Sequence, residues 1–116
     1  MFAYVVRTTF VDRAPMEAFV EWLRARHVAD VCEAGATDAE IVRLDSTSDT
    51  EHAVEVRYRF ASREAFARYE REHAPRLRAD GLAELARLGL GAEAAPASGD
   101  RPRVTFTRTT GEIVER

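Results

Sequence analysis

The sequence has little cysteine, no excess of positive charge and no long apolar run, and each shortage excludes a class of protein. A single cysteine, Cys32, excludes an internal disulfide and a metal site built from several cysteines, and it fits a reducing compartment. A net charge of -3 gives no general attraction to nucleic acid or acidic membranes. No run approaches membrane-spanning length, and the alternating first ten residues predict a strand and not a signal peptide. We therefore expect a cytoplasmic protein with no membrane or nucleic-acid partner.

Motifs that mark common catalytic and metal centres are also missing. The chain has no zinc-finger spacing, no Gly-rich phosphate loop and no G-x-S-x-G elbow. Its 116 residues are 46% hydrophobic and 32% charged, which is ordinary for a folded domain with a real core. We expect one domain that spans residues 1–116.

Alternation of apolar and polar residues predicts four strands. The first covers residues 2–10, the second is a short strand within 38–45, the third covers 54–60, and the last begins at about residue 104. The third has the clearest pattern, since Val54, Val56, Tyr58 and Phe60 share one parity. Val104 and Phe106 of the last strand are expected to face the same core.

Three- and four-residue spacing predicts the helices. The first carries an apolar stripe from Met16 to Val31 and should stop at Gly35. Ser62 can cap the second, which Pro75 should break or kink, with a further helical piece over 76–89. A segment rich in Ala, Gly and Pro, residues 91–102, predicts a linker before the last strand.

The resulting order, β-α-β-β-α-β, is that of the ferredoxin-like fold. This fold is an α+β arrangement with one antiparallel four-stranded sheet and both helices on one face. The first and third strands, which are the most apolar, should be central. A different α+β sandwich with the same elements is the alternative.

Two of the three histidines fall on the apolar stripes of the predicted helices. His27 lies close to Val20 and Leu23 on its stripe, and His73 lies between Phe66 and Leu77. A histidine in a core needs a hydrogen-bond partner, so each is either a satisfied core group or part of a shared pocket. The predicted pocket would also hold these aromatic side chains: Tyr4, Trp22, Tyr58, Phe66 and Tyr69. There a histidine could act as a general base, whereas a metal site lacks an inward carboxylate as third ligand.

Two segments resemble a small bacterial family of unknown function. They are "EWLRARHVADVCEAGATDAEIVRL" and "VEVRYRFASREAFARYEREHAPRLRADGL", and the local markers are Trp22, His27, Gly35, the run "YEREHAPRLR" and the closing strand. The family is similar to dimeric α/β-barrel proteins, the superfamily that includes the antibiotic-biosynthesis monooxygenases. The resemblance implies a dimeric α/β barrel and a ligand pocket between helices and sheet, and the linker 91–102 is longer than it would suggest.

The face of the sheet away from the helices is predicted to be charged. Its residues are Arg7, Glu55, Arg57, Arg59, Arg103, Thr105 and Thr107. It is either a solvated face, or a homodimer face with ion pairs across the interface, or a surface for anions or nucleic acid. In a dimer, Glu55 is the nearest acceptor for Arg57 and Arg59.

Together with the resemblance, these patterns favour a homodimer that binds a small, largely apolar, aromatic or polyketide-like molecule. If the protein is an enzyme, the resemblance implies a cofactor-independent oxygenase, isomerase or cyclase, with His27 and His73 as base and orienting group. Tyr69 or Tyr58 would hydrogen-bond a carbonyl or enolate. Arg76 and Arg78 could receive an acidic substituent, although solvated arginines are the simpler interpretation.

The alternative hypothesis is a non-catalytic, stress-related or protein-interaction module in which both histidines are structural. Cys32 has acidic neighbours, Asp30 and Glu33, which do not activate a thiol, and His52 lies in a polar loop where it should face solvent.

Overall fold

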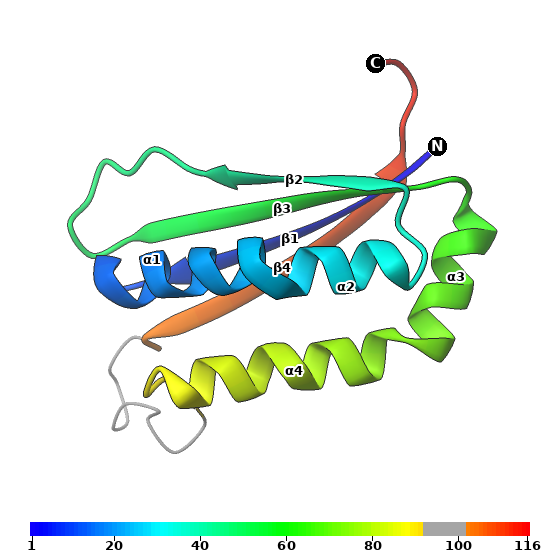
Figure 1. The fold of residues 1–116 in the computed structure, drawn as a ribbon. Helices are drawn as coiled ribbons and strands as arrows, with labels where there is room; N and C mark the ends of the chain where they lie inside the picture. Colours follow the sequence, from blue (N-terminus) through cyan, green and yellow to red (C-terminus); the bar gives the residue numbers. More distant parts are fainter. Residues whose placement is uncertain (92–101) are drawn as a thin grey trace.

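The computed structural model describes residues 1–91 and 102–116, and within them the predicted order of strands and helices is confirmed (Figure 1). The strands are β1 (Phe2–Phe10), β2 (Asp38–Arg43), β3 (His52–Phe60) and β4 (Val104–Glu112). The helices are α1 (Arg13–Trp22), η1 (Leu23–His27), α2 (Val28–Glu33), α3 (Arg63–Glu72) and α4 (Ala74–Arg87). The predicted linker, residues 91–102, lies outside the described residues apart from its two end positions.

The four strands form one antiparallel sheet in the order β2-β3-β1-β4, which confirms the ferredoxin-like arrangement with β1 and β3 at the centre. The pairing sets Tyr4 opposite Tyr58 and Val6 opposite Val56. Because side chains alternate between faces along a strand, this register places the even-numbered residues of β1, β3 and β4 on one face. That face carries the core, which includes Phe10, Val54 and Phe60.

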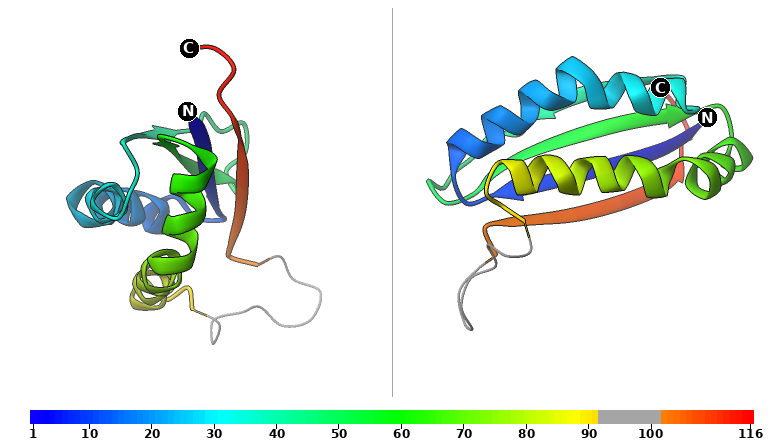
Figure 2. Two further views of the ribbon diagram at one scale, coloured as in Figure 1. Left: turned by 90° about the vertical axis from the view of Figure 1, so that its right-hand side faces the viewer. Right: turned by 60° about the horizontal axis from the view of Figure 1, so that its bottom comes forward.

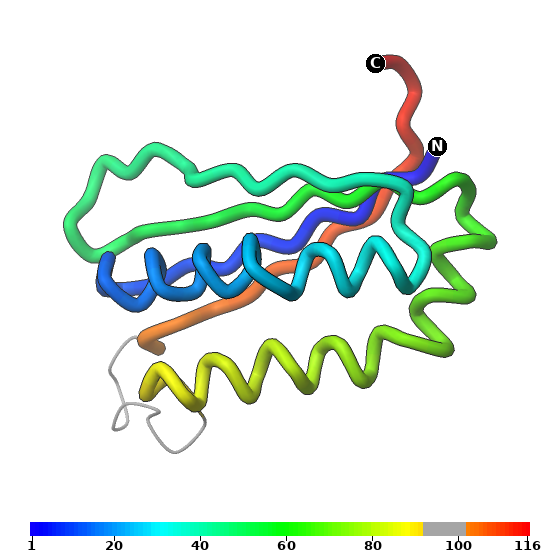
Figure 3. Tube along the Cα trace, in the orientation of Figure 1, coloured from blue at the N-terminus to red at the C-terminus, as the bar shows by residue number. Residues whose placement is uncertain are grey.

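All the helices of residues 1–91 and 102–116 cover the same face of the sheet, and within these residues the other face carries none (Figure 2). The first helical stretch runs without a break from residue 13 to residue 33 (Figure 3), although its middle turn, η1, is a π-helix and not an α-helix. The stretch ends where predicted, since the Gly35 N–H donates to the carbonyl of Cys32 and Gly35 has φ +143°, a conformation that favours glycine.

The second helical stretch begins and breaks as the sequence predicts. The Ser62 hydroxyl accepts a hydrogen bond of 3.0 Å from the Ala65 N–H and so caps α3. The chain leaves helical geometry at His73, which has φ -128° and ψ -33°, and α4 starts at Ala74 with Pro75 in its first turn. Pro75 is tolerated there because the first-turn N–H groups have no intrahelical acceptor.

The core lies between the helices and the sheet. Its buried members from the helices include Met16, Phe19, Leu23, Val31 and Leu77. Among the described residues, none of the helices combines the length and the apolar character that a membrane-crossing segment requires.

Candidate functional site

A cavity of about 60 Å³ lies in the helix–sheet layer over the two central strands. It is lined by Tyr4, Val6, Thr8, Phe19, Trp22, Leu23, His27, Val31, Val56, Tyr58, Tyr69, Leu77, Arg78, Gly81, Leu82, Phe106 and Arg108. Leu82 is 60% exposed and Arg108 is also exposed, so these two mark its solvent end. The volume admits a few water molecules, and a larger ligand would have to move side chains at that end.

Trp22 and His27 form one wall of the cavity and stack face to face. Their ring centroids are 4.5 Å apart and their planes make an angle of 20°. The π-turn brings them together: the Val28 N–H donates to the Leu23 carbonyl, an i to i+5 hydrogen bond, and the two rings are also five residues apart. In a regular α-helix residues five apart point about 140° from each other, because each residue advances by about 100°.

His27 has a buried polar atom without a partner. The imidazole is half-buried, and its Nδ1 is enclosed with no hydrogen-bond partner among the residues that the structure describes. Burial lowers the pKa of His27 below its usual value of 6.5, although the carboxylates of Asp30 and Asp80 act in the opposite direction. The imidazole is therefore neutral at pH 7 and able to accept a proton.

Three tyrosines from two strands and a helix form the floor of the cavity. The Tyr4 ring lies 5.7 Å from the Tyr58 ring and 6.2 Å from the Tyr69 ring, measured between centroids. Burial raises the pKa of Tyr69 to about 12, and burial raises the pKa of Tyr58 well above its usual value. Both hydroxyls are therefore protonated at neutral pH and can donate a hydrogen bond to a ligand oxygen.

Two arginines, Arg78 from α4 and Arg108 from β4, complete the lining. Arg78 donates a long hydrogen bond of 3.5 Å to the Tyr4 hydroxyl, and its Nε is buried with no partner in the described part of the chain. The Arg108 guanidinium lies over the Phe106 ring, 5.5 Å from its centroid.

The structure brings together six of the residues named for the site and leaves three outside. The six that line the cavity are Tyr4, Trp22, His27, Tyr58, Tyr69 and Arg78. The prediction that His27 and His73 share this pocket is wrong. His73 does not line it, because the helical path that predicted its direction ends at that residue.

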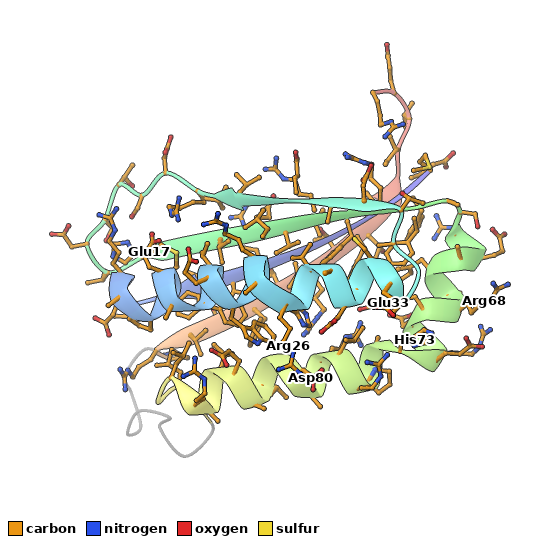
Figure 4. The ribbon with its side chains drawn as sticks, viewed as in Figure 1. Glu17, Arg26, Glu33, Arg68, His73 and Asp80 are labelled. Carbon is orange, nitrogen blue, oxygen red and sulfur yellow. The ribbon has the colours of Figure 1, made fainter. Side chains whose placement is uncertain are left out.

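His73 instead occupies the junction between α3 and α4 (Figure 4). Its Nδ1 pairs with Arg76 Nη2 at 3.2 Å, on the exposed side of the junction. Arg76 is therefore also outside the cavity. Phe66 is buried and packs on Phe2 and on the lining residue Tyr4, but it does not itself line the cavity.

Sequence reasoning missed Arg108, Thr8 and Phe19 as lining residues. A signal for Arg108 was present, because it has the same parity as Val104 and Phe106 on the last strand and so faces the helices. Nothing in the sequence shows that Arg78 and Arg108, thirty residues apart in sequence, meet at one cavity.

The other reactive residues lie elsewhere. His52 hydrogen-bonds the Asp49 carbonyl at 2.8 Å in the β2–β3 loop. Cys32 is half-buried, and burial raises the pKa of its thiol, with Asp38 acting in the same direction. In residues 1–91 and 102–116, no three His, Cys, Asp or Glu side chains come together as a metal ion would require.

The helix-free face of the sheet carries a row of ion pairs. They are Arg7–Glu55 at 2.9 Å, Arg57–Glu55 at 2.8 Å, Arg57–Glu40 at 3.4 Å and Arg59–Asp38 at 2.5 Å. The hydrogen bond from Arg57, helped by Arg7, holds the pKa of Glu55 below its usual value. The arginines that were expected to need partners from a second copy thus find them within the chain.

Comparison with solved structures supports the fold. A dimeric ferredoxin-like protein from an uncultured marine organism is 14% identical, with a TM-score of 0.71 over 99% of this chain and 96% of that one. HapK from Hahella chejuensis is 16% identical, with a TM-score of 0.60 over 100% and 95% of the two chains. A point mutant of SnoaB, a cofactor-independent oxygenase from Streptomyces nogalater, is 16% identical, with a TM-score of 0.53 over 99% and 95%.

At these identities the likeness shows the fold alone. None of the curated proteins compared with the chain matches its sequence. A family model does match, over residues 1–87, which is most of the chain. The chain belongs to the family described as a domain of unknown function, DUF4286.

Proposed function

We propose that this protein binds a small aromatic molecule in the helix–sheet cavity and transfers a proton from it to His27. The observation that carries the proposal is the His27 imidazole, which lines an aromatic cavity while its buried Nδ1 has no partner. An unsatisfied buried nitrogen costs stability unless something else, such as a ligand, uses it. Strained or unsatisfied groups of this kind are enriched at functional sites.

The lining residues suit such a proton transfer without a cofactor. A carbon-bound or hydroxyl proton of the ligand would move to the neutral imidazole and leave an enolate or phenolate in the cavity. The Tyr69 hydroxyl, which remains protonated at neutral pH, would donate a hydrogen bond to the oxygen that becomes negative. Trp22, stacked on His27, would hold the imidazole in one orientation.

SnoaB supports this reaction class by analogy of fold only. It is a cofactor-independent oxygenase on the same fold, so the fold can carry such chemistry. In this chain an oxygenase reaction would need dioxygen to react with the carbanion that proton removal produces, whereas isomerisation or cyclisation would need no further reactant.

We also propose that the protein forms a homodimer in which the sheets of the two copies pack face to face. The helix-free face pairs three arginines with three carboxylates, so a second copy could cover it without leaving a charge unpaired. On β1 this face carries Arg7, which pairs with Glu55, and three smaller residues, Ala3, Val5 and Thr9. The marine protein of the same fold is described as dimeric.

Exchange of the α-protons of 2-tetralone in deuterated buffer tests the proton transfer. This ketone is aromatic and enolisable, and NMR follows its exchange directly. We expect wild-type protein to accelerate the exchange and His27→Phe to lose the acceleration. The matched control is His73→Phe, which removes a histidine outside the cavity and should exchange like wild type.

A second function, a non-catalytic interaction module, is favoured by one observation. The cavity of about 60 Å³ is small for a ligand site. If wild-type protein and His27→Phe exchange the α-protons of 2-tetralone at the same rate, and the ketone does not change Trp22 fluorescence, the proton-transfer function is refuted. The same result would support the interaction module.

A further inference from the structure

The charged side chains that line the cavity are of one sign. Among the described residues of the lining, Arg78 and Arg108 are present and no aspartate or glutamate is. The two arginines come from different layers, Arg78 from helix α4 and Arg108 from strand β4. The strand register pairs Arg108 with Val6, which places Arg108 on the helix-covered face of the sheet. An aromatic cavity whose fixed charges are all positive is complementary to an anion.

Arg78 has unused hydrogen-bonding capacity. A guanidinium carries five N–H donors, and within residues 1–91 and 102–116 those of Arg78 make two long hydrogen bonds, both of 3.5 Å, to the Tyr4 hydroxyl and to Glu70. The Nε lies buried, and none of the described residues offers it an acceptor. The ion pair with Glu70 is largely solvated, since the two side chains are 36% and 52% exposed, and such pairs are weak.

We propose that the ligand of this cavity is an aromatic acid whose carboxylate binds Arg78 and Arg108 while its ring lies among Tyr4, Tyr58 and Tyr69. The proposal rests on the proposed function and adds the chemical class of the ligand. A carboxylate accepts two parallel N–H bonds from a guanidinium, which supplies the acceptor that Arg78 Nε lacks.

The position of the phenol of Tyr69 supports the assignment. Burial raises the pKa of this phenol, and Arg78, Arg108 and Arg76 all act in the opposite direction. The arginines therefore already favour a negative charge beside Tyr69. Arg76 contributes only at a distance, because it does not line the cavity.

Replacing Arg76 thus offers a control that removes the same charge without changing the lining of the cavity, although it also removes the pairing with His73. We would measure binding of benzoate and 2-naphthoate, and of the neutral benzamide and 2-naphthamide, by titration calorimetry. Trp22, the only tryptophan, lines the cavity and gives a second readout by fluorescence. The variants are Arg78→Gln, Arg108→Gln and Arg76→Gln, each with its melting temperature recorded. Arg108 is exposed, so its variant tests the proposal even if Arg78→Gln folds poorly.

We expect wild-type protein to bind the acids more tightly than the amides. Arg78→Gln and Arg108→Gln should each weaken acid binding by about tenfold, as loss of a charged hydrogen bond does, and leave amide binding unchanged. Arg76→Gln should keep the preference. If acids and amides bind equally, or if all three variants weaken the acids alike, acid recognition is refuted while the proposed function stands. If neither acid nor amide binds and Trp22 fluorescence does not change, both are refuted.

Discussion

Replacing His27 by phenylalanine is expected to stabilise the protein. The imidazole packs with its ring 4.5 Å from that of Trp22, an arrangement that a phenyl ring can reproduce. The variant removes the Nδ1 that is buried without a partner, and such an atom costs about 1–3 kcal/mol. Because His27 is only half-buried, we expect the lower end, a gain of about 1 kcal/mol in the free energy of unfolding. For a domain of this size that is a rise of about 4 °C in Tm.

The gain should grow as the pH falls. The pKa of His27 is lowered in the folded state, so between that pKa and the unfolded value of 6.5 the unfolded chain binds more protons. Stability from this group is therefore fully present above pH 6.5 and is lost as the pH falls towards the folded pKa. As the pH falls, wild-type protein loses the stability that comes from the neutral His27, whereas His27→Phe has no imidazole and loses nothing by this route. The difference in Tm should thus widen between about pH 8 and about pH 5.

Thermal unfolding followed by circular dichroism at several pH values measures both effects. His73→Phe serves as the control, because the Nδ1 of His73 already pairs with Arg76 and its removal should give no gain. A fall of several degrees for His27→Phe at every pH would refute the reasoning. It would mean that the imidazole is a satisfied structural group, and the interaction module would then be the better account.

Two further predictions concern folding and assembly. Ser62→Ala should lower the free energy of unfolding by about 1 kcal/mol, because it removes the acceptor that caps α3, and denaturant titration would show a smaller or absent effect if the cap were dispensable. Sedimentation equilibrium should give about twice the 13.0 kDa chain mass at micromolar concentration, and a monomer that persists on concentration would contradict the homodimer.

The sheet could be predicted from the sequence because the alternation of apolar and polar residues is local to each strand. Pairing of the strands does not change which residues of a strand face the core. Alternation in residues 2–10 and 54–60 identified the apolar face, and a shift by one residue in either strand would have turned that face to solvent. The same parity puts Tyr4 and Tyr58 on the helix-covered face, where both line the cavity. The two most apolar strands, β1 and β3, are the central ones, and each pairs with a neighbour along both of its edges.

The helices could be predicted less completely, because helical periodicity holds only while the backbone stays helical. Phe66, Tyr69 and Leu77 are buried as the stripe predicts, but His73 lies at the break that separates α3 from α4. Pro75 gave the position of that break. The sequence carried no signal for the change in direction that the break produces, which moves His73 out of the helix–sheet layer.

The cavity itself depends on tertiary structure that no local pattern records. Its cationic residues come from α4 and β4, which follow one another along the chain but lie on opposite layers, a helix and the sheet, so that only the folded structure brings them to one cavity. Whether packed side chains leave a cavity between them depends on differences of a few ångströms in the positions of their atoms. Gly81, for example, has Trp22 Cη2 at 4.0 Å from the place where a Cβ would stand.

The π-turn at Leu23–His27 links the local irregularity to the proposed chemistry. A regular helix would keep His27 on the stripe of Val20 and Leu23 but would turn Trp22 away from it. With the π-turn, the indole and the imidazole stack on the same wall of the cavity, with their ring planes 20° apart. The turn gives up the regular i to i+4 bonding at one place, and such turns occur frequently at functional sites. A purely structural helix would gain nothing from this geometry, which leaves a buried nitrogen without a partner. In the proposed site the turn would set the orientation of the imidazole beside an aromatic ligand, while burial, which lowers the pKa of His27, keeps that imidazole neutral.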